Sequence, residues 1–264
     1  WQESQRGTPT FGIPPETFVA FIENHDQISN NPRGERLRFQ TSPGRYRAMT
    51  ALLFLGPWTP MLFQGQEFGA SSPFVFFTDV GDNDMREAIR KGRFQFLAQF
   101  PSMASEGIQR NLPSPSDPRV FASCKLNFSE RATNRELYDL YVDLIKLRRE
   151  DSRFREQVAG QVDGAVLGSA SFVLRFFAAE NDERLLIVNF GKRQVLAPAP
   201  EPLLAPPLGF EWETMWTSES PRYGGPGAVP LVTQEQWLLP AEAAVALRLV
   251  TEKAPRREPK RRRP

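Results

Sequence analysis

The residues best suited to chemistry lie near the start of the chain, in the segment FIENHDQISNNPRGERL at positions 21–37, which contains the only histidine of the protein, His25. Residues 18–22 form a continuous apolar run of strand length, which is typical of a buried strand in a parallel sheet. Ligands of parallel α/β proteins bind at the carboxyl ends of such strands. Four polar residues at this end are therefore candidates for ligand binding: Asn24, His25, Asp26 and Gln27.

A further candidate, Glu67, follows the apolar run at 59–63, which predicts the next strand. If the two strands are neighbours, their ends present carboxylates, an imidazole and amides at one face of the sheet. These groups donate and accept hydrogen bonds and therefore suit a ligand rich in hydroxyl groups. A phosphate would instead call for glycine-rich cradles and basic side chains. A structural interpretation stays open, because Asn-His-Asp is ordinary turn sequence and Glu67 could pair with a nearby arginine.

Strand and helix patterns alternate in the first part of the chain. Ser42-Pro43 predicts the start of a helix that Gly56 ends, and a further helix is expected over about 84–100. The sequence TNRE at 133–136 predicts a capping box, followed by a helix that ends in Arg148-Arg149. These arginines suit the negative end of their own helix. The alternation predicts an α/β fold with a parallel sheet.

From about residue 155 the pattern changes to β structure. The apolar runs 172–177 and 184–190 are joined by turn residues and predict a hairpin, and 244–250 predicts a final strand. The basic tail carries a net charge of +5, so residues 1–251 sum to −3. Such a tail is typical of a disordered terminus. The sequence thus predicts three parts: an α/β part at 1–155, a β domain at 156–251 and a disordered basic tail at 252–264.

Composition excludes several classes of protein. A single cysteine, Cys124, excludes an internal disulfide, and with one histidine a Cys/His zinc site is not expected. We expect neither a metal nor a cofactor. No window approaches the roughly 18 apolar residues of a membrane span, and nothing marks export, so the cytoplasm is the expected location. Because the body is net negative, nucleic acid is not an expected partner.

The segment at 21–26, FIENHD, resembles the last catalytic motif of the α-amylase family of glycoside hydrolases, which closes the seventh strand of a (β/α)₈ barrel. A more specific similarity, over about residues 15–250, is to the malto-oligosyltrehalose trehalohydrolases. The motifs that carry it are NHDQISN (24–30), GERL (34–37), MLFQGQEFG (61–69), SPFVFFTD (72–79), CKLNFSER (124–131), LLAPP (203–207) and SESPRYGG (218–225).

The resemblance implies the C-terminal portion of a (β/α)₈ barrel, about strands seven and eight, followed by an all-β sandwich. It implies retaining hydrolysis of the α-1,4 bond next to the terminal trehalose unit of a malto-oligosaccharide. Asp26 matches the carboxylate that stabilises the transition state, and His25 matches an imidazole that binds the sugar. Gln27 and Asn30 fall in the substrate loop, and Asn24 and Glu67 are added as substrate-binding candidates.

In this family the nucleophile and the general acid come from strands four and five, about 5–5.5 Å apart. We therefore expect them upstream of Trp1, in a missing N-terminal part of the same enzyme, and we expect this chain alone to be inactive. Two alternatives are a fragment of another α-amylase family member, such as a glycogen branching enzyme, and a non-catalytic carbohydrate-binding module.

Three other features can be interpreted either as purely structural or as functional. The aromatic cluster Phe74, Phe76 and Phe77 could stack on sugar rings, but packing within a loop is the commoner use of such residues. Cys124 is expected to be a small core residue. The sequence RYGG at 222–225 is turn-like in composition, with a smaller chance of contacting substrate.

Overall fold

The computed structural model describes residues 7–10, 12–31, 33–101, 103–158, 160–227, 231 and 236–252. The chain forms two compact units. The first comprises Trp1–Ala159 and Ser218–Ala228, and the second comprises Gly160–Thr217 and Val229–Pro264. The sequence analysis assigned all of 156–251 to the β domain, whereas the structure groups Ser218–Ala228 with the first unit. Apart from Glu252, the predicted disordered tail lies outside the described residues.

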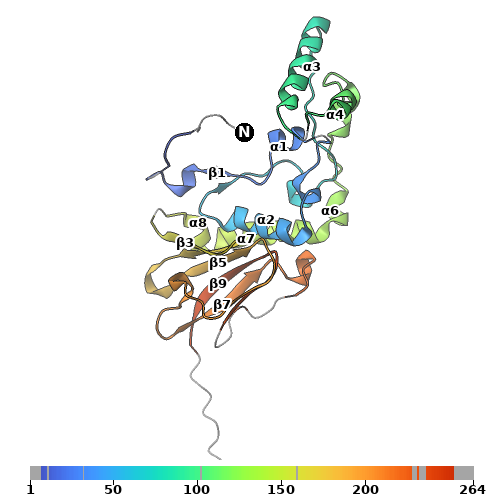
Figure 1. Ribbon diagram of the computed structural model, residues 1–264. Helices are drawn as coiled ribbons and strands as arrows, with labels where there is room; N and C mark the ends of the chain where they lie inside the picture. Colours follow the sequence, from blue (N-terminus) through green and yellow to red (C-terminus); the bar gives the residue numbers. More distant parts are fainter. Residues whose placement is uncertain are drawn as a thin grey trace, which may run out of the picture. The chain divides into compact units, whose positions relative to one another are not determined.

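A βαβ arrangement organises the start of the first unit. Strand β1 (Val19–Ala20) pairs in parallel with β2 (Thr59–Pro60), and Val19 lies opposite Thr59. Helix α1 (His25–Ser29), the 3₁₀ turn η2 (Leu37–Phe39) and helix α2 (Pro43–Leu55) connect them (Figure 1). The prediction that the two apolar runs are parallel neighbours is therefore confirmed, whereas the expectation that the first run is buried is wrong, because Val19 is 56% exposed.

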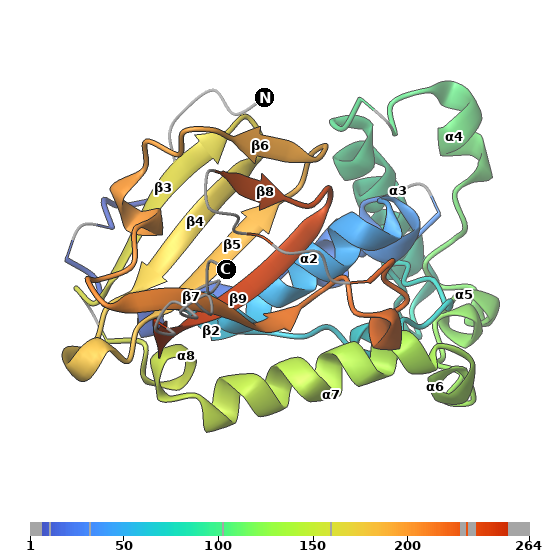
Figure 2. The same cartoon turned by 90° about the horizontal axis from the view of Figure 1, so that it is seen from below.

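Helix α2 packs against helix α7 (Arg135–Glu150), and the two lie side by side in Figures 1 and 2. The Ser42 side chain caps α2, as predicted, by accepting a hydrogen bond from the backbone N–H of Arg45 at 3.3 Å. The contact surface buries alanines of α2 and leucines of α7, and it includes a hydrogen bond of 3.1 Å between the hydroxyls of Tyr46 and Tyr141. Two long helices thus form a packed pair in the first unit.

Arg148 and Arg149 lie in the last turn of α7, as predicted, and Arg148 has a second role that was not predicted. Its guanidinium donates hydrogen bonds to the backbone carbonyls of Phe54, Gly56 and Trp58, at and after the end of α2. It therefore caps the neighbouring helix as well, and burial lowers the pKa of this guanidinium.

The predicted capping box at 133–136 is wrong, although the helix behind it is present. Thr133 is the last residue of the short helix α6 (Glu130–Thr133), so Asn134 becomes the N-cap of α7, and no side chain caps that helix. The amide of Asn134 instead donates hydrogen bonds of 3.0 Å to the carbonyls of Phe68 and Gly69. A long-range contact has replaced the local one.

The remaining helical elements of the first unit are shorter or lie apart from α2 and α7. Helix α3 begins after the N-cap Asp82 and runs through Gly92 without a break. The bounds are α3 (Asn83–Ala98), α4 (Glu106–Asn111), α5 (Pro118–Ser123), α8 (Ser152–Glu156), η1 (Pro15–Thr17), η3 (Gln66–Phe68) and η6 (Pro221–Tyr223). In the part of the chain that the structure describes, no helix is both long and apolar enough to cross a membrane.

The second unit is built from antiparallel strands (Figure 2). Its five-stranded sheet has the order β3-β4-β5-β9-β7, and a separate pair joins β6 to β8. The predicted hairpin is confirmed as β4 and β5, with Ser171 opposite Asn189. The bounds are β3 (Val162–Gly168), β4 (Ser171–Phe176), β5 (Arg184–Asn189), β6 (Gln194–Leu196), β7 (Phe210–Thr217), β8 (Trp237–Leu239) and β9 (Ala243–Thr251), with the 3₁₀ turns η4 (Ala179–Asn181) and η5 (Pro202–Leu204).

A single apolar cluster holds the second unit together. It joins side chains of the five-stranded sheet, such as Val173, Ile187 and Leu247, to Trp237 and Leu239 of β8. The β6–β8 pair therefore covers one face of the larger sheet, and this shared core explains why the sequence from residue 160 is rich in β-branched and aromatic residues.

One buried ion pair joins the end of β1 to the segments that follow β2. The guanidinium of Arg36 is 1% exposed and lies 3.5 Å from the Glu23 carboxylate. It also donates hydrogen bonds of 2.8 Å to the carbonyls of Gln64 and Ser72, while Glu23 accepts one of 2.9 Å from the backbone N–H of Leu37. Burial raises the pKa of the Glu23 carboxyl and lowers that of Arg36.

Arg36→Met would leave the buried Glu23 carboxylate without its ion-pair partner. We therefore predict that this substitution lowers the free energy of unfolding by about 3–5 kcal/mol. Glu23→Leu should cost a similar amount, and the double variant should cost clearly less than the sum of the two. The measurement is urea-induced unfolding of each variant.

The matched control is the exposed pair of Arg110 and Glu106, whose side chains approach to 2.7 Å. Arg110→Met should cost less than about 1 kcal/mol. If Arg36→Met were as mild as this control, the buried pair would not organise this part of the fold.

Candidate functional site

The segment that carries the single histidine folds as the helix α1, directly after β1. Asn24 is its N-cap, and its side-chain oxygen accepts hydrogen bonds from the N–H groups of Asp26 at 2.8 Å and Gln27 at 3.2 Å. The Gln27 side-chain oxygen in turn accepts a hydrogen bond of 2.9 Å from the N–H of Asn24. This reciprocal pair is a capping box. The side-chain oxygens of Asn24 and Gln27 therefore hold the helix start.

The two residues between them turn outward. The side chains of His25 and Asp26 are 66% and 72% exposed, and His25 Nε2 lies 3.6 Å from Asp26 Oδ1. The cap fixes the backbone on both sides of this pair. The structure thus presents an imidazole and a carboxylate together, on a short rigid helix, just after the end of a parallel strand.

His25 and Asp26 line an open cavity of about 470 Å³. This volume lies within the usual range for small-ligand sites, roughly 300–1,000 Å³. The other walls come from the segment that follows η3 and from α3. The remaining lining residues are Ser29, Phe74, Val75, Phe76, Phe77, Ile89, Arg93 and Phe96.

Arg93 of α3 links the walls of this cavity. It donates a hydrogen bond of 2.9 Å to the carbonyl of Ser29, and its guanidinium lies 5.1 Å from the ring centre of Phe76 and 5.6 Å from that of Phe96. Burial lowers the pKa of Arg93, and the nearby Asp26 carboxylate acts in the opposite direction. A cation between two rings leaves an aromatic and positively charged wall beside the exposed carboxylate.

The sequence analysis missed Arg93 and its neighbours on α3. A signal was present, because Ile89, Arg93 and Phe96 are spaced by four and three residues and therefore share one face of a helix. That spacing could not show which part of the chain the face contacts.

The aromatic cluster divides between packing and exposure. Phe74 packs edge-to-face on Phe63 and Phe77, with ring centres 5.0 and 5.9 Å away, whereas Phe76 is 41% exposed. Cys124 is buried and free, and its Sγ accepts a hydrogen bond of 3.3 Å from the N–H of Val75. Phe76 is therefore the member of the cluster that remains available to a ligand.

Gly34 fixes the approach of this aromatic segment to the loop after α1. Its carbonyl accepts a hydrogen bond of 2.9 Å from the N–H of Phe74. Its φ is +61°, and a Cβ at this position would meet the Phe74 carbonyl oxygen at 2.6 Å. Only glycine fits both conditions without strain.

Of the six predicted site residues, His25 and Asp26 line this cavity and the other four do not: Asn24 and Gln27 form the helix cap, and Asn30 and Glu67 lie elsewhere. Asn30 ends α1, where its backbone N–H donates to the carbonyl of Asp26 at 2.9 Å, and its side-chain oxygen is buried without a partner among the described residues. Glu67 lies on η3, where its charge acts on the guanidinium of Arg36. No group of three or more metal-ligating side chains occurs among the described residues.

The arrangement can bind and polarise a ligand. The carboxylate and the imidazole can bind neighbouring hydroxyl groups, and the exposed aromatic ring offers a flat apolar surface. A carboxylate that faces a ligand also stabilises positive charge that develops on it.

Residues 159–257 match a family described as a domain of unknown function, DUF3459. The chain is 38% identical over 201 residues to a malto-oligosyltrehalose trehalohydrolase of Deinococcus radiodurans, which is 72% of this chain and 31% of that protein. It is 39% identical over 170 residues to one of Arthrobacter ramosus, covering 62% of this chain and 29% of that protein. The chain thus spans less than a third of the length of these relatives.

A crystal structure from Salmonella typhimurium assigned to the α-amylases superposes with a TM-score of 0.66 at 26% identity, covering 93% of this chain and 37% of that one. A trehalose-6-phosphate hydrolase of Bacillus licheniformis superposes with a TM-score of 0.51 at 14% identity, covering 88% of this chain and 43% of that one. The second likeness concerns the fold alone.

We predict that Gly34→Ala lowers the free energy of unfolding by at least about 1 kcal/mol, because the new Cβ is strained at positive φ and collides with the Phe74 carbonyl. Amide hydrogen exchange at Phe74 should become faster, since its bond to residue 34 is disturbed. Urea unfolding and exchange measured by mass spectrometry test both effects.

Gly92→Ala is the matched control, because Gly92 lies inside α3 with nothing within 4 Å of an added Cβ. It should be neutral or stabilise the protein by up to about 1 kcal/mol. Equal effects of the two substitutions would contradict the role given to Gly34.

Proposed function

Because this chain corresponds to the C-terminal part of the malto-oligosyltrehalose trehalohydrolase family, we propose that it forms part of a glycosidase. The proposed reaction is hydrolysis of the α-1,4 glucosidic bond next to the terminal trehalose unit of a malto-oligosaccharide. One observation carries the proposal: the capped helix α1 presents Asp26 and His25 side by side into a cavity with an aromatic wall.

The proposed role of Asp26 is to stabilise the transition state. Hydrolysis of a glycosidic bond passes through a transition state with positive charge at the anomeric carbon. A carboxylate that binds the sugar hydroxyls there gains attraction as this charge develops, so it favours the transition state over the ground state. The cap on α1 supports this role, since it fixes the backbone from which the Asp26 carboxylate extends.

The proposed role of His25 is to bind the sugar. An imidazole 3.6 Å from the Asp26 carboxylate can hold the hydroxyl next to the one that the carboxylate binds. Phe76, with its exposed ring, is proposed as an apolar surface for the sugar. Asn24 and Gln27 act through the helix cap and are positioning residues in this proposal.

The nucleophile and the general acid are proposed to come from the part of the enzyme that this chain does not cover. The parallel pair β1–β2 is interpreted as strands seven and eight of a (β/α)₈ barrel, whose carboxyl ends carry the active site. The second unit is interpreted as the β sandwich that follows the barrel. The likeness to the α-amylase of Salmonella typhimurium over 93% of this chain supports this interpretation.

We expect the 264-residue chain by itself to release no trehalose from maltotriosyltrehalose, because retaining hydrolysis needs two carboxylates on opposite sides of the bond. The measurement is product release by the purified chain, with a full-length relative as the positive control. Turnover comparable to that of the relative would mean that the catalytic pair has been misassigned.

In the full-length enzyme, we predict that Asp26→Asn lowers kcat by about 10²–10³-fold and leaves KM nearly unchanged, because the charge acts mainly on the transition state. His25→Ala should be milder and should raise KM as well, since its hydrogen bond serves both states. Steady-state kinetics with maltotriosyltrehalose checks both variants.

The matched control is Asp84→Asn, an exposed carboxylate at the start of α3 outside the cavity lining, which should leave kcat unchanged. If Asp26→Asn retained more than about a tenth of kcat, a loss below ~1.4 kcal/mol, Asp26 would be a structural carboxylate and the proposed role would fail.

A further inference from the structure

The first unit contains a second cavity, of about 550 Å³, that shares no lining residue with the one at His25 and Asp26. All of its lining residues belong to Trp1–Ala159 and Ser218–Ala228. We propose that this cavity is a second carbohydrate site, which binds a short neutral oligosaccharide. The ligand class follows from the lining, so the proposal stands even if the proposed reaction at Asp26 is wrong.

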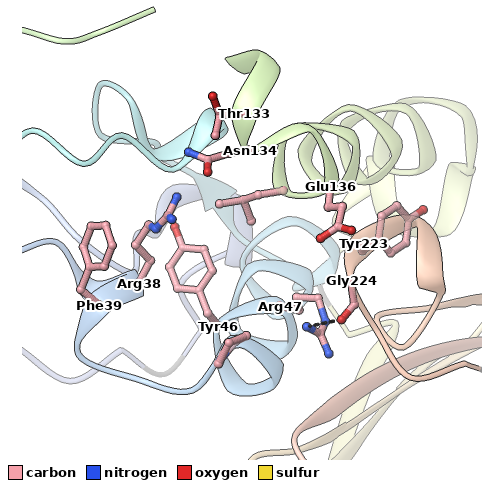
Figure 3. A pocket seen from close by; sticks show the side chains of 11 residues that line it. Arg38, Phe39, Tyr46, Arg47, Thr133, Asn134, Glu136, Tyr223 and Gly224 are labelled. Carbon is pink, nitrogen blue, oxygen red and sulfur yellow. Dashed lines mark hydrogen bonds between the residues drawn. The ribbon is translucent and has the colours of Figure 1, made fainter. Parts of the chain in front are cut away.

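One sequence motif that the proposed active site leaves unused contributes to this cavity. SESPRYGG (218–225) supplies Tyr223 and Gly224 on one wall, and Arg38 and Phe39 lie on another. In Figure 3, Arg38 and Phe39 lie on one side of the cavity and Glu136, Tyr223 and Gly224 on the other. The two walls are about 180 residues apart in the sequence.

The wall at 218–225 is held by a buried charged residue of α2. Arg47, 7% exposed, donates hydrogen bonds to the Ser218 carbonyl at 2.9 Å and to the Glu219 carboxylate at 3.1 Å. Tyr223 donates its hydroxyl proton to Asp143 at 2.7 Å. These bonds fix the backbone of the motif, so this wall does not depend on a ligand for its shape.

Gly224 makes room for the side chain of Glu136. Its φ is +73°, and a Cβ at this position would meet Glu136 Oε2 at 2.6 Å. The glycine therefore lets the carboxylate lie against the backbone of the motif, at the cavity. A larger residue would push the carboxylate away, and this close approach is a second reason for glycine beside the backbone angle.

The chemistry of the lining fits a sugar. Phe39 has a ring that is 47% exposed, and the guanidinium of Arg38 lies 4.6 Å from its centre. Glu136, on the opposite side and exposed, can accept hydrogen bonds, while Arg38 can donate them. A ligand with an apolar face and a rim of hydroxyl groups would use all three, the ring through stacking and the charges through hydrogen bonds.

The balance of charge argues against an ionic ligand. The charge of Arg47 is matched by Glu219 at 3.1 Å, which leaves one guanidinium, Arg38, and one carboxylate, Glu136, among the lining residues. An anion would be attracted by Arg38 and repelled by Glu136. A cation would be attracted by Glu136 and repelled by Arg38. A neutral ligand avoids both costs.

The test uses maltotriose as the probe and the whole 264-residue chain carrying His25→Ala and Phe76→Ala, which removes the two sugar contacts proposed for the first cavity. Calorimetric titration should show maltotriose binding with a dissociation constant of about 0.1–10 mM. Adding Phe39→Ala or Glu136→Gln should weaken binding at least tenfold. The matched control Glu106→Gln, an exposed glutamate of α4 outside both linings, should not change it.

Hydrogen exchange of the chain carrying His25→Ala and Phe76→Ala gives an independent readout of where maltotriose binds. Maltotriose should protect amides in 37–39 and 134–137. The proposal is overturned if no binding is detected up to about 50 mM, if Phe39→Ala and Glu136→Gln leave the affinity unchanged, or if protection falls elsewhere. Tighter binding of glucuronate than of maltotriose would overturn the assignment to a neutral ligand.

Discussion

The buried guanidinium of Arg36 is the constraint on which the first unit depends. It donates hydrogen bonds to the carbonyls of Gln64 and Ser72 and pairs with the Glu23 carboxylate, so it joins three separate segments, while its Nη2 has no partner among the described residues. Burial lowers the pKa of Arg36 and raises that of Glu23, so desolvation outweighs their mutual attraction. Such a pair adds little net stability but strongly disfavours other arrangements of these segments. It therefore fixes where α1 begins and where the aromatic segment lies.

Gly34 and the helix cap of α1, together with the ion pair, fix the positions of the cavity walls. Arg36 holds the Ser72 carbonyl, and two residues later the N–H of Phe74 binds Gly34 at 2.9 Å. The aromatic wall is thus attached to the loop after α1 at two neighbouring points. Asn24 and Gln27 hold the helix start from the other side. The geometry of the cavity follows from these few backbone contacts, rather than from contacts among the residues that face a ligand.

Local signals were sufficient for much of the fold. The Ser42 cap, the two parallel strands and the hairpin of β4 and β5 follow from patterns within a few residues, and all are observed. The failures are long-range. The capping box predicted at 133–136 is absent because Thr133 ends α6, and Asn134 binds the carbonyls of Phe68 and Gly69 instead. The sequence also does not predict the contact of Arg148 with the end of α2. A sequence pattern describes local partners, whereas tertiary contacts can replace them.

For the candidate site, the sequence indicates the segment, but it does not show which of its residues cap the helix and which face the cavity. Asn24 and Gln27 have the spacing of a capping box, and that assignment explains why His25 and Asp26, at the first two positions of α1, face outward. A loop residue could turn its carboxylate in many directions, which would have to be restricted when a ligand binds. In α1 the cap restricts the backbone of Asp26, although not its side-chain torsions, before any ligand binds. Asn24 and Gln27 therefore stabilise the start of the helix, whereas His25 and Asp26 are left free to face a ligand.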